Sequence, residues 1–66
     1  MYNIEAEMVR YGVSRADVAR VIKKDYRTAC NKLSGATDFT VPEAFAVRDE
    51  LFPSMRVEYL FAEVGR

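Results

Sequence analysis

The residue types best suited to specific chemistry lie on one short predicted helix, within residues 25–34. At about 100° per residue, Arg27 and Asn31 point away from the apolar side that carries Ala29, and Thr28 lies on the flank of that outward face. An arginine can donate two hydrogen bonds to guanine, and an asparagine can pair similarly with adenine. The spacing therefore favours contact with DNA base edges, although the same residue types also occur on helices that only face solvent.

Catalytic chemistry is not indicated elsewhere in the chain. The sequence has no histidine, no glycine-rich phosphate-binding motif and no nucleophile beside a base. Asp49 and Glu50 are adjacent, so a helix would turn their carboxylates apart. The single cysteine, Cys30, leaves no pattern for a disulfide or a zinc site. We therefore expect no enzyme, no cofactor, no metal ion and no small-molecule substrate.

The formal charge of the chain is zero, but the charges are unevenly distributed. Residues 10–32 contain seven basic and two acidic side chains, a balance of +5, and the flanking segments are correspondingly acidic. Such polarity can direct one face of a protein toward phosphates. Charge alone leaves open the alternative that this is the uneven solvated surface of a small helical protein. The basic residues are Arg10, Arg15, Arg20, Lys23, Lys24, Arg27 and Lys32.

The length of 66 residues suits one domain, and half of the residues are hydrophobic. No linker, repeat or low-complexity segment divides the chain, so we expect a single domain over residues 1–66. The N-terminal segment is acidic and amphipathic, where a signal peptide would be basic and then apolar. The sequence therefore predicts a cytoplasmic protein without a membrane partner.

The elements that position these side chains are predicted to be helices, because apolar residues recur at helical spacing and no strand alternation of useful length occurs. A first helix buries Ile4, Met8 and Tyr11 and ends at Gly12. Capping residues mark four further helix starts, so the expected fold is compact and all-α, with five helices. The predicted caps are Ser14 with Asp17, Asp25, Thr40 with Glu43, and Ser54.

Residues 14–35 resemble a known helix-turn-helix. The segments SRADVA, from residue 14, and DYRTACNKLSG, from residue 25, are similar to the second helix and the recognition helix of phage repressor and Cro-like regulators, the Xre family. The likeness covers nearly the whole chain. It implies a repressor-like helix-turn-helix domain whose third helix enters the major groove of operator DNA.

The resemblance also assigns contacts with bases and phosphates. Tyr26, Arg27 and Asn31 match positions that the family uses near bases, and Thr28 is a further base-reading candidate. Tyr26 suits a position at the edge of the core equally well. The predicted phosphate contacts begin with two residues that match family positions and extend to polar neighbours: Arg15 and Thr37, then Arg10, Ser14, Lys24 and Lys32.

Four positions depart from the family pattern, and one of them is Ala29, which stands where a branched apolar residue is common. Lys23 stands where a glycine in the left-handed conformation is usual, and a lysine there costs roughly 1 kcal/mol unless the turn has another shape. Lys24 replaces an apolar residue that plugs the core, and its stem can lie along the core while its ammonium reaches a phosphate. Ala36 replaces a frequent lysine. These changes bear on DNA affinity more than on the fold.

Two classes of function follow from these patterns. The first is an operator-binding transcriptional regulator of phage or prophage type, acting as a homodimer in the cytoplasm of a bacterial host. We place its dimer contact on Val57, Tyr59, Leu60 and Phe61, residues that can instead complete the core of the monomer. The second is an interaction module, such as an antirepressor or an antidote subunit, which keeps the fold and does not bind DNA.

Overall fold

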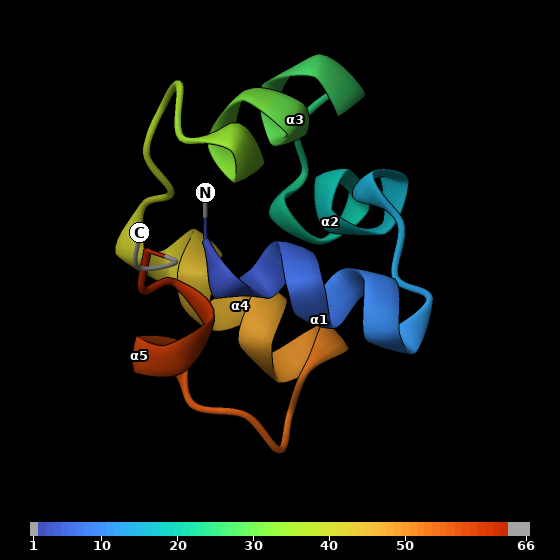
Figure 1. The fold of residues 1–66 in the computed structure, drawn as a ribbon. Coiled ribbons are helices and arrows are strands. Elements are labelled where there is room, and N and C mark those ends of the chain that lie inside the picture. The colour runs from blue at the N-terminus through green and yellow to red at the C-terminus, as the bar shows by residue number, and fades with distance from the viewer. Residues whose placement is uncertain (1, 64–66) are drawn as a thin grey trace.

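Helices account for all of the regular structure between residues 2 and 63, the part of the chain that this computed structural model describes (Figure 1). The one β-type contact there is an isolated bridge between Tyr2 and Glu63. The expected all-α class with five helices is therefore confirmed. The helices are α1 (Asn3–Tyr11), α2 (Arg15–Ile22), α3 (Tyr26–Ser34), α4 (Val41–Leu51) and α5 (Val57–Leu60).

The starts of α2, α3 and α4 follow from local capping chemistry. The Ser14 hydroxyl accepts a hydrogen bond from the Asp17 backbone, and the Asp17 carboxylate accepts one from the Ser14 backbone. A second reciprocal pair, Thr40 with Glu43, opens α4, while Asp25 caps α3. These bonds satisfy amide groups that a helix leaves without partners at its N-terminus.

The last helix begins later than the sequence predicts. Ser54 does not cap it; α5 starts at Val57, and its N-cap, Arg56, makes no side-chain capping bond. The intervening chain turns after α4, where the Met55 amide donates to the Phe52 carbonyl. The reason is that Phe52 continues into the core before the chain reverses, which places Ser54 in the turn and not at a helix start.

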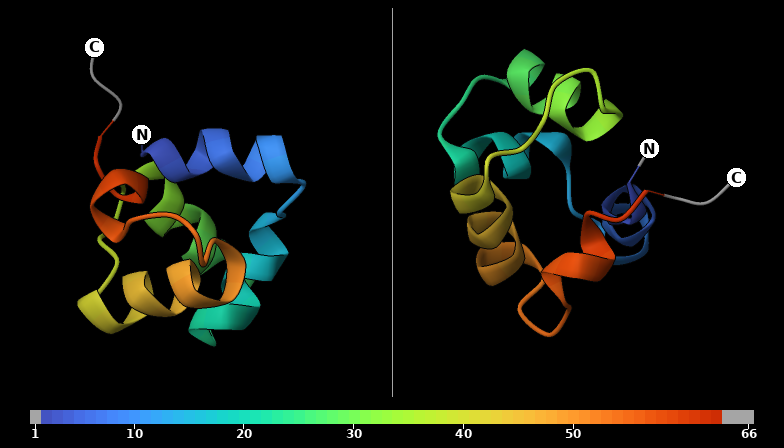
Figure 2. Two further views of the ribbon diagram at one scale, coloured as in Figure 1. Left: turned by 90° about the horizontal axis from the view of Figure 1, so that it is seen from below. Right: turned by 90° about the vertical axis from the view of Figure 1, so that its left-hand side faces the viewer.

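The core lies between the helices, with α2 packed against α3 and α4, and α5 packed against α1 and α4 (Figures 1 and 2). One expected core residue is not buried: Tyr11 is 60% exposed, because its ring lies only edge-on against Phe52 at the periphery. The buried apolar residues come from all five helices and the turn after α4: Ile4, Met8, Val18, Ala19, Ile22, Ala29, Leu33, Val47, Phe52 and Leu60.

Segments from opposite ends of the sequence lie side by side in this arrangement (Figure 2). The Asn3 amide donates to the Ala62 carbonyl at 3.1 Å, beside the bridge between Tyr2 and Glu63. Figures 1 and 2 place α3 and α5 on opposite sides of the molecule. None of the helices in residues 2–63 combines the length and the apolar character needed to cross a bilayer.

Candidate nucleic-acid interface

The outward face of α3 has the orientation that the sequence predicts. Arg27 and Asn31 are exposed and Thr28 is half-buried, whereas Ala29 and Leu33 are completely buried. Burial of small and branched apolar groups on one side fixes the rotation of the helix about its axis. The polar side chains are therefore presented to solvent on a rigid element rather than on a loop.

The turn between α2 and α3 consists of residues 23–25 and is closed by the backbone. Lys23 has φ 63° and ψ 41°, the left-handed conformation, and is the one non-glycine residue with positive φ among residues 2–63. The next amide, that of Lys24, donates to the Ala19 carbonyl at 3.1 Å. Gly12 at the end of α1 has the same conformation, and the Val13 amide donates to Met8 in the same pattern. Lys23 thus takes the backbone role of a glycine.

Three cations around this turn have no ion-pair partner within the described part of the chain: Lys23, Lys24 and Arg27. Every other lysine or arginine in residues 2–63 lies in an ion pair. Free positive charge is therefore concentrated on five consecutive residues at the turn and the start of α3. Lys23 was not among the predicted contacts, and the net charge of residues 10–32 was the signal that pointed to this region.

A negative charge is fixed at the start of α3 as well. The Asp25 carboxylate accepts a hydrogen bond from the Thr28 amide at 2.8 Å, and hydrogen bonding to Thr28 lowers the pKa of Asp25. Asp17 at the start of α2 behaves likewise, because hydrogen bonds from Ser14 and Arg20 lower its pKa. Both carboxylates are ionised at neutral pH, so each already compensates the partial positive charge at the N-terminus of its helix, α2 or α3.

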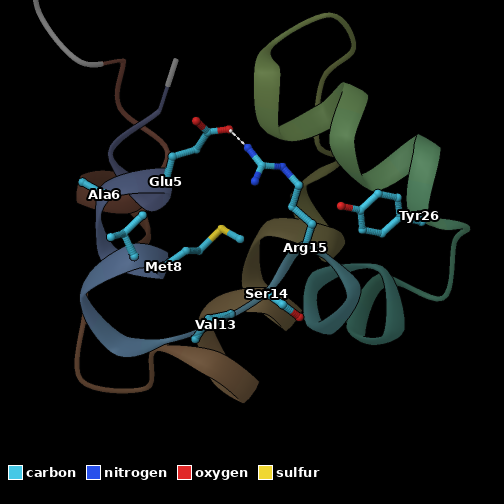
Figure 3. Close-up of a pocket in the computed structure, with 8 residues that line it drawn as sticks. Glu5, Ala6, Met8, Val13, Ser14, Arg15 and Tyr26 are labelled. Atoms are coloured by element: carbon cyan, nitrogen blue, oxygen red, sulfur yellow. Dashed lines mark hydrogen bonds and ion pairs between the residues drawn. The ribbon is translucent and has the colours of Figure 1, made fainter.

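Two predicted phosphate contacts are paired with carboxylates on α1. Arg10 Nε lies 3.5 Å from Glu7 Oε1, and Arg15 Nη2 lies 3.3 Å from Glu5 Oε2. Arg15 crosses a groove of about 520 Å³ to reach Glu5, as Figure 3 shows. The spacing of three residues on one helix could have indicated Glu7 as the partner of Arg10, whereas the pair of Arg15 with Glu5 depends on how α1 lies beside α2.

Lys32 is engaged within the protein and is not directed to solvent. Its Nζ lies 2.9 Å from Glu43 Oε1 and donates to the Asp38 carbonyl at 2.9 Å. The Lys32 and Glu43 side chains are only 11% and 12% exposed. The structure therefore gives Lys32 the role of fastening α3 to α4, which corrects its prediction as a phosphate contact.

The remaining predicted contacts surround the same region. Ser14 is exposed and uses its hydroxyl as the cap of α2. Thr37 is exposed in the loop after α3, and its amide donates to the Asn31 carbonyl. Tyr26 is 58% exposed and lines the groove crossed by Arg15, so it does not belong to the core (Figure 3).

The predicted dimer residues on the last helix are divided between core and surface. Leu60 is completely buried, which removes it from any contact surface and is a correction. Val57 and Phe61 are half-buried, and Phe61 packs against the rings of Phe39 and Tyr2. Tyr59 is 44% exposed, and its hydroxyl donates to Glu7 at 2.5 Å. Both the Phe61 ring contacts and the Tyr59 hydrogen bond lie within the monomer.

No family model matches the sequence, and neither a curated protein nor a solved structure is similar to the chain at a significant level. Within residues 2–63, no group of three or more histidine, cysteine, aspartate or glutamate side chains is placed to hold a metal ion. The functional argument therefore depends on the geometry and charge of the α2–turn–α3 unit.

Proposed function

We propose that this protein is a sequence-specific DNA-binding transcriptional regulator that inserts α3 into the major groove of operator DNA. The observation that carries the proposal is the exposed polar face of α3 next to the unpaired cations of the turn. A helix fits the major groove, and base edges there distinguish all four base pairs. A small all-α domain with such a helix at one side has the shape that this docking requires.

The polar residues divide into two kinds of contact in this proposal. Arg27 has its guanidinium free to donate two hydrogen bonds to a guanine, and Asn31 offers an amide to an adenine. Thr28 and Tyr26 border the same face. Lys23 and Lys24 contact phosphates, which sets the position of the helix without selecting sequence. Base contacts therefore supply the specificity and the turn supplies much of the affinity.

One α3 reads only a few base pairs, so we propose that two copies occupy half-sites about 34 Å apart. The proposed contact surface is formed by the exposed parts of Val57, Tyr59 and Phe61. Sedimentation across a dilution series, with and without operator DNA, tests this part of the proposal. A monomer under every condition would contradict the dimer and leave the DNA-binding proposal standing.

Selection from a random-sequence DNA pool at low salt tests the main proposal. We expect a preferred motif, and we expect Arg27→Ala and Asn31→Ala each to reduce discrimination at one position by about 1–3 kcal/mol. Arg56→Ala is the matched control, because Arg56 is an exposed arginine beside α5, on the side opposite α3. If no sequence is enriched above background, the proposal fails.

The ion pairs also favour a second candidate function. Arg10, Arg15 and Lys32 are compensated within the protein, as expected for a helix-turn-helix fold that binds another protein and not DNA. Salt separates the two candidates. Binding through phosphates weakens steeply with salt, with a slope set by the number of phosphates neutralised. Failure to enrich any DNA would favour this interaction module.

A further inference from the structure

Glu5 lies on α1 beside Arg15, a predicted phosphate contact. Arg15 Nη2 donates to Glu5 Oε2 at 3.3 Å, and the two side chains are 44% and 17% exposed. Figure 3 shows the guanidinium directed across the groove to Glu5, with the Tyr26 hydroxyl pointing toward the aliphatic part of Arg15. The protein itself therefore compensates the charge of Arg15 when DNA is absent.

The contact between Glu5 and Arg15 has the features of a pair that can exchange partners. It joins one nitrogen to one oxygen, whereas the strongest arginine–carboxylate pairs make two parallel hydrogen bonds. Nearly half of the Arg15 side chain is open to solvent, so a DNA phosphate can reach the guanidinium from outside. A phosphate can thus replace the carboxylate without disturbing the fold.

The replacement has a cost on the carboxylate side. Glu5 is mostly covered by the protein, and among residues 2–63 Arg15 is its one ion-pair partner. Once Arg15 turns to a phosphate, the Glu5 carboxylate is left without that partner and beside an incoming anion. Two negative groups then share a cation that fully compensates only one of them.

We propose that Glu5 competes with DNA phosphate for Arg15 and is a positioning residue that limits the affinity of the interface. This inference rests on the proposed DNA-binding function and concerns the regulation of the same site. Because phosphate contacts carry no sequence information directly, Glu5 lowers the affinity for all DNA sequences alike. It therefore sets how strongly the protein binds without altering which operator it selects.

The test is a double-mutant cycle of Glu5→Gln and Arg15→Gln, read as dissociation constants for matched and mismatched DNA at one low salt concentration. Glu5→Gln is expected to tighten binding about threefold to fivefold, equally on both DNAs. In the Arg15→Gln background the same change is expected to alter affinity less than about twofold. Glu63→Gln, which removes an equal charge from an exposed residue outside the groove of Arg15 and outside the proposed dimer surface, is expected to change affinity less than about twofold.

Three results would overturn the inference while DNA binding by the unmodified protein stays intact. An equal gain in both backgrounds would mean that Glu5 acts only by net charge. Weaker binding by Glu5→Gln would mean that Glu5 presents Arg15 to DNA. Arg15 guanidinium ¹⁵N resonances that do not move on Glu5→Gln, in the DNA-free protein, would mean that the pair is not formed in solution. If the unmodified protein binds no DNA, the proposed function fails and this inference fails with it.

Discussion

Lys23 combines an unfavourable backbone conformation with a free charge at the candidate interface. Its left-handed geometry is the one that Gly12 adopts at the end of α1, and a residue with a Cβ atom adopts it at a cost of roughly 1 kcal/mol. In return, Lys23 places an ammonium with no ion-pair partner among residues 2–63 at the turn, followed directly by the equally unpaired Lys24. Lys23 therefore lowers the stability of the fold while it adds a positive charge to the turn, and strained residues of this kind are found at functional sites.

Replacing Lys23 by glycine is expected to stabilise the fold and weaken the proposed DNA binding. Relief of the left-handed strain should raise the free energy of unfolding by about 1 kcal/mol, offset in part by the greater freedom of glycine in the unfolded chain. Urea denaturation measures the gain, and titration of DNA measures the loss.

Lys24→Gly is the matched control for that substitution. Lys24 carries the same charge one residue later but does not have a positive φ, so glycine there should lower stability by about 0.5 kcal/mol. Equal unfolding free energies for the two glycine variants would contradict the strain at Lys23.

At the scale of elements, the pair of Lys32 with Glu43 joins α3 directly to α4. Burial would raise the pKa of Glu43, but hydrogen bonds from Thr40 and Lys32 outweigh that effect and lower it. Glu43 thus serves two elements at once, because its carboxylate caps α4 and holds the ammonium of α3. The pair therefore links α3 to α4, while α3 packs mainly against α2.

Lys32→Met is expected to lower the free energy of unfolding by about 1–2 kcal/mol, between the values for exposed and for fully buried ion pairs. Methionine keeps most of the apolar part of the lysine side chain, so the decrease in unfolding free energy measures the contribution of the ammonium group. Arg20→Met is the control, because the pair of Arg20 with Asp17 is exposed and should contribute less than about 1 kcal/mol. Similar losses in the two variants, measured by thermal or urea unfolding, would show that the Lys32 pair is no stronger than a surface pair.

The sequence was sufficient for features that depend on close neighbours along the chain. The N-terminal caps at Ser14 and Thr40 each join groups that lie three residues apart. The inward direction of Ala29 and Leu33 follows from the rotation of about 100° per residue along a helix. For Lys23 the sequence left two alternatives, a left-handed residue or a turn of another shape, and the structure has the left-handed one.

Features that depend on distant segments could not be predicted. The sequence does not distinguish Lys32 from an exposed lysine, because Glu43 comes close to it only through the position of α4. The Tyr59 hydroxyl meets Glu7 across 52 residues, and nothing in the spacing of either residue indicates that bond. For Leu60 the sequence left a dimer contact and the monomer core as alternatives, and the packing of α5 against α1 and α4 decides for the core.

For the whole molecule, the ionisable contacts predict a stability profile with losses at both ends of the pH range. Asp17, Asp25 and Glu43 have pKa values below their ordinary values of 3.8, 3.8 and 4.5 in the fold. Their contribution is therefore complete above the unfolded values and is lost as pH falls through the folded ones. The contribution of Tyr59 depends on pH in the opposite direction, because its hydrogen bond to Glu7 raises its pKa above 10.0. That contribution is complete below the unfolded pKa and is lost as pH rises through the folded one.

We expect the free energy of unfolding to be nearly constant from about pH 5 to pH 9 and to fall on either side. The loss of unfolding free energy at alkaline pH should be smaller in Tyr59→Phe, since phenylalanine has no hydroxyl proton to lose beside Glu7. Tyr11→Phe is the control, because the Tyr11 hydroxyl makes no hydrogen bond within residues 2–63. Urea unfolding at a series of pH values gives both profiles, and an unchanged alkaline limb in Tyr59→Phe would contradict the assignment.

The contact between the two ends of the described chain makes the fold a nearly closed ring of helices. Residues 2 and 3 meet residues 62 and 63 through the backbone. A short peptide can therefore join these ends, and new termini can be opened in the exposed turn at Pro53 and Ser54. Such a circular permutant keeps α1 to α4 in their original order, so the turn that carries Lys23 stays continuous while the chain begins in the turn after α4.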